Sequence, residues 1–147
     1  MNIEFIKLNQ DWNAEPNSPQ EKVHTENSSV ILEFTVNPWA YDGFKEGERA
    51  RLIFKSSSKY RLGATNDEGW YQGKCRYGNQ APDWGEFYMV KERSPIAIPV
   101  NDWVNVNSTA SKNHYLLYLR DNTFECIATN FKEITTNDWQ QRANSSR

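Results

Sequence analysis

Two neighbouring carboxylates, Asp67 and Glu68, lie in the glycine-bounded stretch YRLGATNDEGW at residues 60–70. Carboxylates carry out general acid–base and nucleophilic catalysis, often as two groups that act on one target. Because adjacent residues of an extended chain point to opposite sides, these two acids form a poor shared-proton dyad. A catalytic role therefore needs a partner from elsewhere in the chain, and Glu125 and Asp121 are the available acids.

The same stretch also has a purely structural interpretation. Asn66 and Asp67 suit a turn in which their side chains bond to nearby backbone N–H groups. However, residues 63–85 contain five of the seven glycines, together with Trp70 and Trp84. A loop of this length and aromatic content is more often functional than an average loop. Both interpretations stay open, and a ligand-binding pocket here would draw on Arg61, Asn66, Asp67, Glu68, Trp70, Trp84, Tyr118 and Glu125.

The size and charge of the chain set limits on its function. Its 147 residues, 24% charged and 37% apolar, fit one folded domain. The 17 basic and 19 acidic residues leave a net charge of −2, whereas nucleic-acid binders usually carry a basic excess. No apolar run approaches the ~20 residues that span a bilayer. We therefore expect neither nucleic acid nor a membrane as a partner.

Cys75 and Cys126 are the two cysteines, and the first residues, MNIEFIKLNQDW, have neither the basic nor the apolar region of an export signal. These features predict a cytoplasmic protein with two free thiols. Cys126 lies in an apolar segment and is expected to be an inert core residue, while Cys75 lies among polar loop residues. The two cysteines and two histidines lack the spacing of a zinc site, so metal binding would have to rely on carboxylates. We predict no metal and no cofactor.

Most segments that predict regular structure have the two-residue period of β-strands. Residues 29–37 place Val30, Leu32, Phe34 and Val36 on one face, and residues 49–56 alternate in the same way. The chain is therefore predicted to be mainly β, as a single-domain antiparallel sandwich or open barrel with long loops and at most one or two short helices. We expect this domain at residues 1–140, a flexible tail at 141–147, strands at 2–8, 29–37, 49–56, 59–63 and 86–92, mostly loop at 9–28 and a short helix at 136–144.

The segment NHYLLYLRDNTFECIATNF, residues 113–131, predicts a β-hairpin. Asp121-Asn122 suits its two-residue turn, because both residue types tolerate positive φ. This turn would pair Tyr118 with Glu125, on a mixed face that also carries His114. There Glu125 is either a pocket acid with a shifted pKa or a surface acid in a weak ion pair. The opposite, uncharged face would join the core through Tyr115, Leu117, Leu119, Phe124, Cys126 and Ala128, and a one-residue shift would mix the two faces.

Four blocks of the sequence, in this order, resemble a family of small uncharacterised bacterial proteins: GERARLIF, YRLGATNDEGW, YGNQAPDWGEFYMVKERS and HYLLYLRDNTFECIA. The resemblance covers about residues 47–128. Members of this family carry a similar run of features: an arginine-glycine turn, an Asn-Asp-Glu triplet, a glycine-tyrosine loop and a terminal strand close to Asp-Ser-Thr-Phe-Glu-Cys. The family has no assigned activity. This chain departs from it with Asn122 in place of the serine and with Trp70-Tyr71 after the triplet. The resemblance implies no reaction, but it implies hallmark positions at Arg61, Asn66, Asp67, Glu68, Phe124, Glu125 and Cys126.

Three functions fit these features. The first is a small binding or interaction protein, such as a regulator or an immunity-type partner that masks another protein. Six tryptophans and seven tyrosines offer interface anchors for it, and no complete catalytic motif is present. The second is a carbohydrate-recognising module that uses exposed aromatic rings beside polar side chains, and the third is a carboxylate-dependent hydrolase with Asp67 or Glu68 opposite Glu125. We predict the binding or interaction protein, with another protein or a small polar ligand as its partner. The sequence leaves open whether the protein is an enzyme and what its oligomeric state is.

Overall fold

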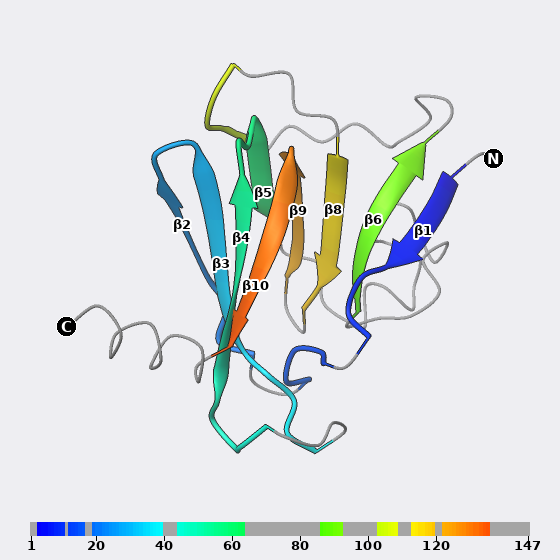
Figure 1. The fold of residues 1–147 in the computed structure, drawn as a ribbon, viewed down its shortest axis with the longest axis vertical. Coiled ribbons are helices and arrows are strands. Elements are labelled where there is room, and N and C mark those ends of the chain that lie inside the picture. The colour runs from blue at the N-terminus through cyan, green and yellow to red at the C-terminus, as the bar shows by residue number, and fades with distance from the viewer. Residues whose placement is uncertain are drawn as a thin grey trace.

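The computed structural model describes residues 3–10, 12–16, 19–39, 44–63, 86–92, 103–108, 113–119 and 122–135. Every regular element in these ranges is a β-strand, and the strands form two antiparallel sheets. Within the described ranges the two sheets face each other and do not close into a barrel (Figure 1). The predicted mainly β fold is confirmed, in the form of a sandwich.

The two sheets differ in size, and all neighbouring strands run antiparallel. The larger sheet consists, from edge to edge, of β1 (Ile3–Lys7), β6 (Phe87–Glu92), β8 (Asn113–Tyr118), β9 (Thr123–Ala128), β5 (Lys59–Gly63) and β7 (Val104–Asn105). The smaller sheet consists of β10 (Asn130–Thr135), β4 (Arg49–Lys55), β3 (Ser29–Thr35) and β2 (Lys22–Glu26). Strands β1, β3, β4, β5 and β6 lie where the sequence predicts them.

The central strands of the smaller sheet form because apolar residues occupy every second position. In β3, Val30, Leu32 and Phe34 are fully buried, and in β4 Leu52 and Phe54 are fully buried. All five side chains belong to the core between the two sheets. The intervening positions of β4 are half-buried or exposed, so the predicted alternation is confirmed.

Aromatic rings fill the space between the sheets. Phe54 of β4 contacts the rings of Tyr115, Phe124 and Phe87, with centroid separations of 5.2, 5.4 and 6.0 Å. These three rings belong to β8, β9 and β6 of the larger sheet. Because Phe54 contacts three strands of the opposite sheet, it is a principal connection between the two layers.

Cys126 lies in this core, as the sequence predicts. Its side chain is fully buried, and its thiol lies 3.5 Å from the hydroxyl of Ser57. Burial raises the pKa of Cys126 to about 12, although the Ser57 contact acts in the opposite direction. The thiol therefore stays protonated and unreactive at neutral pH.

One predicted loop is partly wrong. Residues 9–28 were expected to be mostly loop, yet Lys22–Glu26 form β2, which pairs with β3 and is the edge strand of the smaller sheet. Four of its five side chains are exposed and the remaining one, Val23, is half-buried. An edge strand with little burial needs no apolar alternation, so periodicity gives no signal for it.

The predicted hairpin exists, but its register is wrong by two residues. Strands β8 and β9 pair Tyr118 with Thr123 and Leu116 with Glu125. The Leu119 N–H donates to the carbonyl of Asn122 at 2.8 Å, so the ladder includes Asn122 instead of turning there. A two-residue shift leaves each side chain on its predicted face, and the expected core face is confirmed. Because both registers give the same faces, the sequence could distinguish them only by the position of the turn. The predicted turn at Asp121-Asn122 was wrong.

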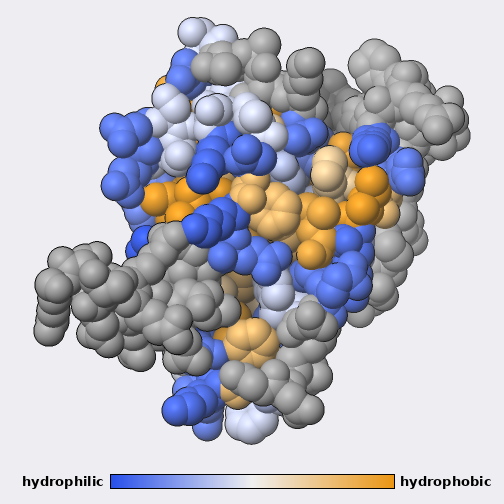
Figure 2. Space-filling view, viewed as in Figure 1, coloured by the Kyte–Doolittle hydropathy of each residue, from blue (hydrophilic) through white to orange (hydrophobic). Residues whose placement is uncertain are grey.

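The surface seen in Figure 2 is polar over much of its area, with an apolar band across the middle. The most exposed large hydrophobic side chains among the described residues are Trp39 at 72% and Val104 at 46%. No helix in the described ranges is long and apolar enough to cross a membrane. The expected helix at 136–144, the expected tail at 141–147 and nearly all of the glycine-rich loop lie outside those ranges.

Candidate functional site

The central strands β6, β8 and β9 of the larger sheet carry buried side chains on both faces. Leu117 and Phe124 point into the core between the sheets, whereas Tyr88, Leu116 and Tyr118 lie on the opposite face of the same sheet. All five side chains have no solvent exposure. A charged group on this second face therefore needs partners within the protein, because burying an unpaired charge is very costly.

Glu125 is the charged group at the centre of this second face. Its carboxylate is fully buried. Arg61 lies directly across from it on β5, and its Nη1 donates to Glu125 Oε2 at 2.7 Å. His114 lies diagonally across on β8, and its Nε2 is 2.7 Å from Glu125 Oε1. Because an ionised carboxylate only accepts hydrogen bonds, His114 Nε2 carries the hydrogen and donates it.

The geometry of this Arg61–Glu125–His114 network determines what it can do. Both carboxylate oxygens hold a partner, and the three side chains carry no net charge when the imidazole is neutral. The His114 ring meets the ring of Trp103 edge-on at a centroid distance of 6.4 Å, and Lys59 Nζ lies 4.6 Å from the Trp103 ring centre. The network can orient an imidazole and fix a guanidinium in place. Its carboxylate has no exposed surface from which to attack a substrate.

The structure places only three of the predicted site residues. Arg61 and Glu125 form the ion pair just described, and Tyr118 lies on the same buried face. The expected pairing of Tyr118 with Glu125 is wrong, because Leu116 lies opposite Glu125 and Thr123 lies opposite Tyr118. The other candidates, Asn66, Asp67, Glu68, Trp70 and Trp84, lie outside the described residues.

Gly63 is a part of the network that the sequence analysis missed. It lies two residues after Arg61 on the same face of β5, and the Arg61 guanidinium folds over it. A Cβ atom at Gly63 would clash with Arg61 Nη2 and would lie 2.8 Å from Arg61 Cζ. The arginine-glycine spacing R-x-G at the end of a strand was the available signal, since two positions along a strand share a face.

We expect Gly63→Ala to move the Arg61 guanidinium and to weaken its bond to Glu125. The cost should be about 1–3 kcal/mol of unfolding free energy, the usual range for overpacking a buried site, measured by urea denaturation. The same change in an Arg61→Met background should cost clearly less, because the clashing guanidinium is absent. Equal costs in both backgrounds would contradict the proposed contact.

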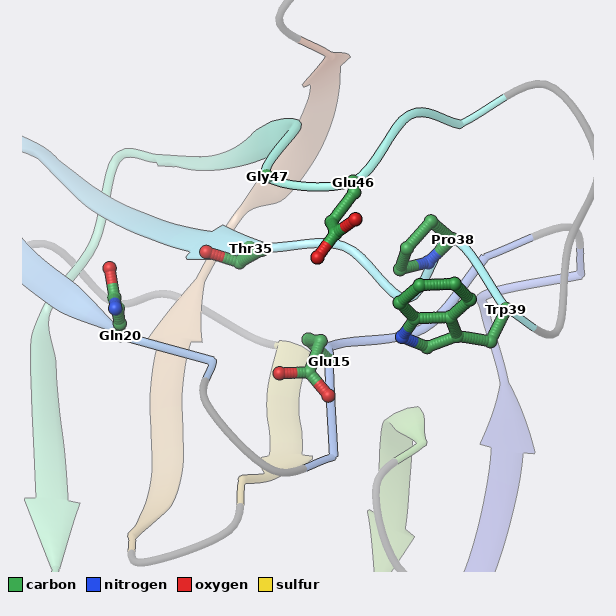
Figure 3. A pocket seen from close by; sticks show the side chains of 7 residues that line it. All are labelled: Glu15, Gln20, Thr35, Pro38, Trp39, Glu46 and Gly47. Carbon is green, nitrogen blue, oxygen red and sulfur yellow. The ribbon is translucent and has the colours of Figure 1, made fainter.

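A second candidate site is an open cavity of about 390 Å³ at one end of the smaller sheet. Figure 3 shows Trp39 beside Pro38 at one end of it and Gln20 at the other, with the Glu46 and Glu15 side chains extending between them. The complete lining is Glu15, Gln20, Thr35, Pro38, Trp39, Glu46 and Gly47.

Backbone hydrogen bonds hold the walls of this cavity together. The Glu15 N–H donates to the Thr35 carbonyl at 2.8 Å, and Ala14 bridges to Val36. The Trp39 N–H donates to the side-chain oxygen of Asn37 at 3.0 Å, which fixes the chain just after the strand. The cavity is therefore built by segments anchored to β3.

Arg49 fixes the end of the cavity that lies away from Trp39. Its Nη1 donates to Thr35 Oγ1 at 3.1 Å, and its Nη2 donates to the Gln20 carbonyl at 2.9 Å. The guanidinium therefore lies against two lining residues without lining the cavity itself. The sequence analysis missed this site. A tryptophan directly after a strand-ending proline, in a polar segment, was the available signal.

Comparison of the chain with models of protein families, with curated proteins and with solved structures gave no match. The resemblance to a family of small bacterial proteins therefore stays a prediction. Among the described residues, no group of three or more His, Cys, Asp or Glu side chains is arranged to hold a metal ion.

Proposed function

We propose that this chain is a small binding protein that holds its ligand or partner in the cavity beside Trp39. The observation that carries this proposal is the exposure of Trp39 at the edge of a preformed cavity. Its side chain is 72% exposed, whereas tryptophan normally buries its ring. Tryptophan dominates the energetics of many interfaces because its large rigid ring also carries a polar N–H group. A volume near 390 Å³ is at the lower end of the usual range for ligand sites.

The Arg61–Glu125–His114 network supports a binding function less directly. It offers no exposed acid, which weighs against the alternative of a hydrolase that uses Glu125. The decisive distance for that alternative, from Glu68 to Glu125, involves a residue outside the described ranges. A regulator or an immunity-type partner, located in the cytoplasm, is the form of binding protein that we propose, and the polar loop at Asn66, Asp67 and Glu68 is a further contact surface in that proposal.

One observation also favours the alternative of a carbohydrate-recognising module. An exposed indole ring beside carboxylate and amide side chains is suited to stack on a sugar ring and bind its hydroxyl groups. The residues that provide this arrangement are Trp39, Glu15, Glu46 and Gln20, whereas Trp70 and Trp84 of the predicted pocket lie outside the described residues. Under this alternative the same cavity would bind a neutral ligand.

Saturation-transfer NMR with a panel of neutral sugars, organic cations, carboxylate anions and short peptides tests the proposed function. We expect at least one class to give signals with the wild-type protein that disappear with Trp39→Ala. The matched control is Val104→Ala, which removes the other strongly exposed hydrophobic side chain of the described ranges and should leave the signals unchanged. If no class binds in a Trp39-dependent way, the proposed function is wrong.

A further inference from the structure

The charge of the cavity indicates which ligand it selects. Two of its seven lining residues, Glu15 and Glu46, are acids, and none is basic. Arg49 lies against the outside of the wall through Thr35 and Gln20, and it offsets only part of the formal charge of −2. The lining therefore carries a formal negative charge, which disfavours an anion and favours a cation.

The apolar part of the lining narrows this choice to an organic cation. Pro38 and the exposed ring of Trp39 form one end of the cavity, and the two carboxylates lie beside them (Figure 3). Among aromatic rings, that of tryptophan attracts an ammonium group most strongly through its π electrons. A metal ion would use the carboxylates but not the indole, whereas an ammonium group with attached carbon atoms uses both.

We propose, on the basis of the proposed binding function, that the Trp39 cavity binds an organic ammonium ion through the Trp39 ring and the carboxylates of Glu46 and Glu15. The cavity is open to solvent and small, so its occupant is either a small free molecule of choline size or a single lysine side chain presented by a peptide. Both share the same chemistry, which is a positive nitrogen next to apolar carbon.

Titrations followed by the indole N–H signals in ¹H–¹⁵N NMR spectra test this proposal, with the Trp39 signal assigned by its loss in Trp39→Phe. The probes are choline chloride, Nα-acetyl-lysine methylamide, and 3,3-dimethyl-1-butanol, which has the shape of choline without its charge. We expect saturable shifts of the Trp39 signal with the two cations, and binding of the neutral alcohol that is at least about tenfold weaker. Tighter binding of choline assigns a free small molecule as the ligand, and tighter binding of the lysine derivative assigns a peptide side chain.

The affinity for choline in charge variants and at two salt concentrations shows whether the carboxylates contribute to binding. Glu46→Gln should weaken choline binding by about threefold or more, and Glu15→Gln should act in the same direction. The matched control is Glu4→Gln, which makes the same charge change at an exposed position of β1 in the other sheet. Raising NaCl from about 0.02 M to about 0.3 M should also weaken the binding, because Glu46 is exposed to the solvent and Glu15 is half-buried.

The outcomes that overturn the inference differ from those that overturn the proposed function. Equal affinity for choline and 3,3-dimethyl-1-butanol would show that the cavity recognises shape and not charge. Trp39-dependent binding of methyl β-D-glucoside without binding of either cation would replace the cation by a sugar and leave the proposed function intact. No shift of the Trp39 signal with any cation overturns the inference, while the wider panel with Trp39→Ala decides the proposed function.

Discussion

Replacing Glu125 by alanine should destabilise the protein by about 3–5 kcal/mol, the usual cost of removing one partner of a buried ion pair. The carboxylate has no solvent exposure, and the side chain of Arg61 is only 9% exposed. Without Glu125 the guanidinium would remain in a buried environment with its principal anionic partner gone, and His114 would lose the acceptor of its Nε2–H group. Most of the cost therefore comes from the groups that are left behind.

Urea denaturation of the wild-type protein and Glu125→Ala measures this effect, and a second pair of residues provides a matched control. Arg51 and Glu33 also form a cross-strand ion pair at 2.7 Å, but their side chains are 32% and 20% exposed. Glu33→Ala should cost less than about 1 kcal/mol, because solvent screens this partly exposed pair and replaces the lost partner. Both sites join an arginine to a glutamate and differ in burial and in the additional His114 contact of Glu125.

A variant that removes the whole network tests whether the network adds net stability compared with apolar side chains at the same positions. Arg61→Met, His114→Phe and Glu125→Leu together replace all three polar groups by apolar ones, and this triple variant should recover most of the stability that Glu125→Ala loses. If Glu125→Ala costs no more than Glu33→Ala, the network is not structural, and Glu125 becomes available for the pocket role that the sequence analysis considered.

The sequence was sufficient to predict the core-facing sides of the strands. In β3, β4 and the β8–β9 hairpin, one side of each strand meets the opposite sheet, so apolar residues occupy alternate positions there. The same periodicity could not fix the hairpin register, because a shift of two residues preserves both faces. As a result, His114 and Arg61 were not recognised as the partners of Glu125, although Arg61 and Glu125 were both candidate site residues.

The burial of the second face of the larger sheet was missed for a related reason. In β8, the run Tyr115, Leu116, Leu117 and Tyr118 is apolar at every position, and all four side chains are buried. A continuous apolar run indicates a strand that is covered on both sides. This run was interpreted as a core face and a mixed face, so Glu125 was expected to be a pocket or surface acid.

The Trp39 cavity depends on tertiary structure, and its one local sequence signal is the tryptophan that follows Pro38. It brings together residues 15, 20, 35, 38–39 and 46–47, which come from three separate parts of the chain. Composition predicted only that some tryptophans would serve as anchors, and it could not say which of the six rings stay exposed. Exposure is determined by where a chain segment leaves the sheet, as Pro38 and Trp39 do after β3.

Replacing Phe54 by alanine should cost about 3–5 kcal/mol, because it opens a cavity between the two sheets. Phe54 is fully buried, and besides its three ring contacts across the sandwich it faces Phe131 of β10 at 6.4 Å in its own sheet. Ring pairs of this kind add about 0.5–1.5 kcal/mol beyond the area that they bury. The loss is large compared with the ~5–15 kcal/mol total stability of an ordinary domain.

Two comparisons test whether this cost comes from the contact between sheets. Ile53→Ala changes the adjacent residue of β4, whose side chain is half-buried on the outer face, and should cost only about 1–2 kcal/mol. Phe124→Ala should also be costly alone, but combined with Phe54→Ala it should cost less than the sum of the two, because the rings are in contact. If Phe54→Ala costs no more than Ile53→Ala, or if the two phenylalanine changes are additive, the sheets are not held together by this ring cluster. The rigidity that both candidate sites require would then have to come from the strand ladders alone.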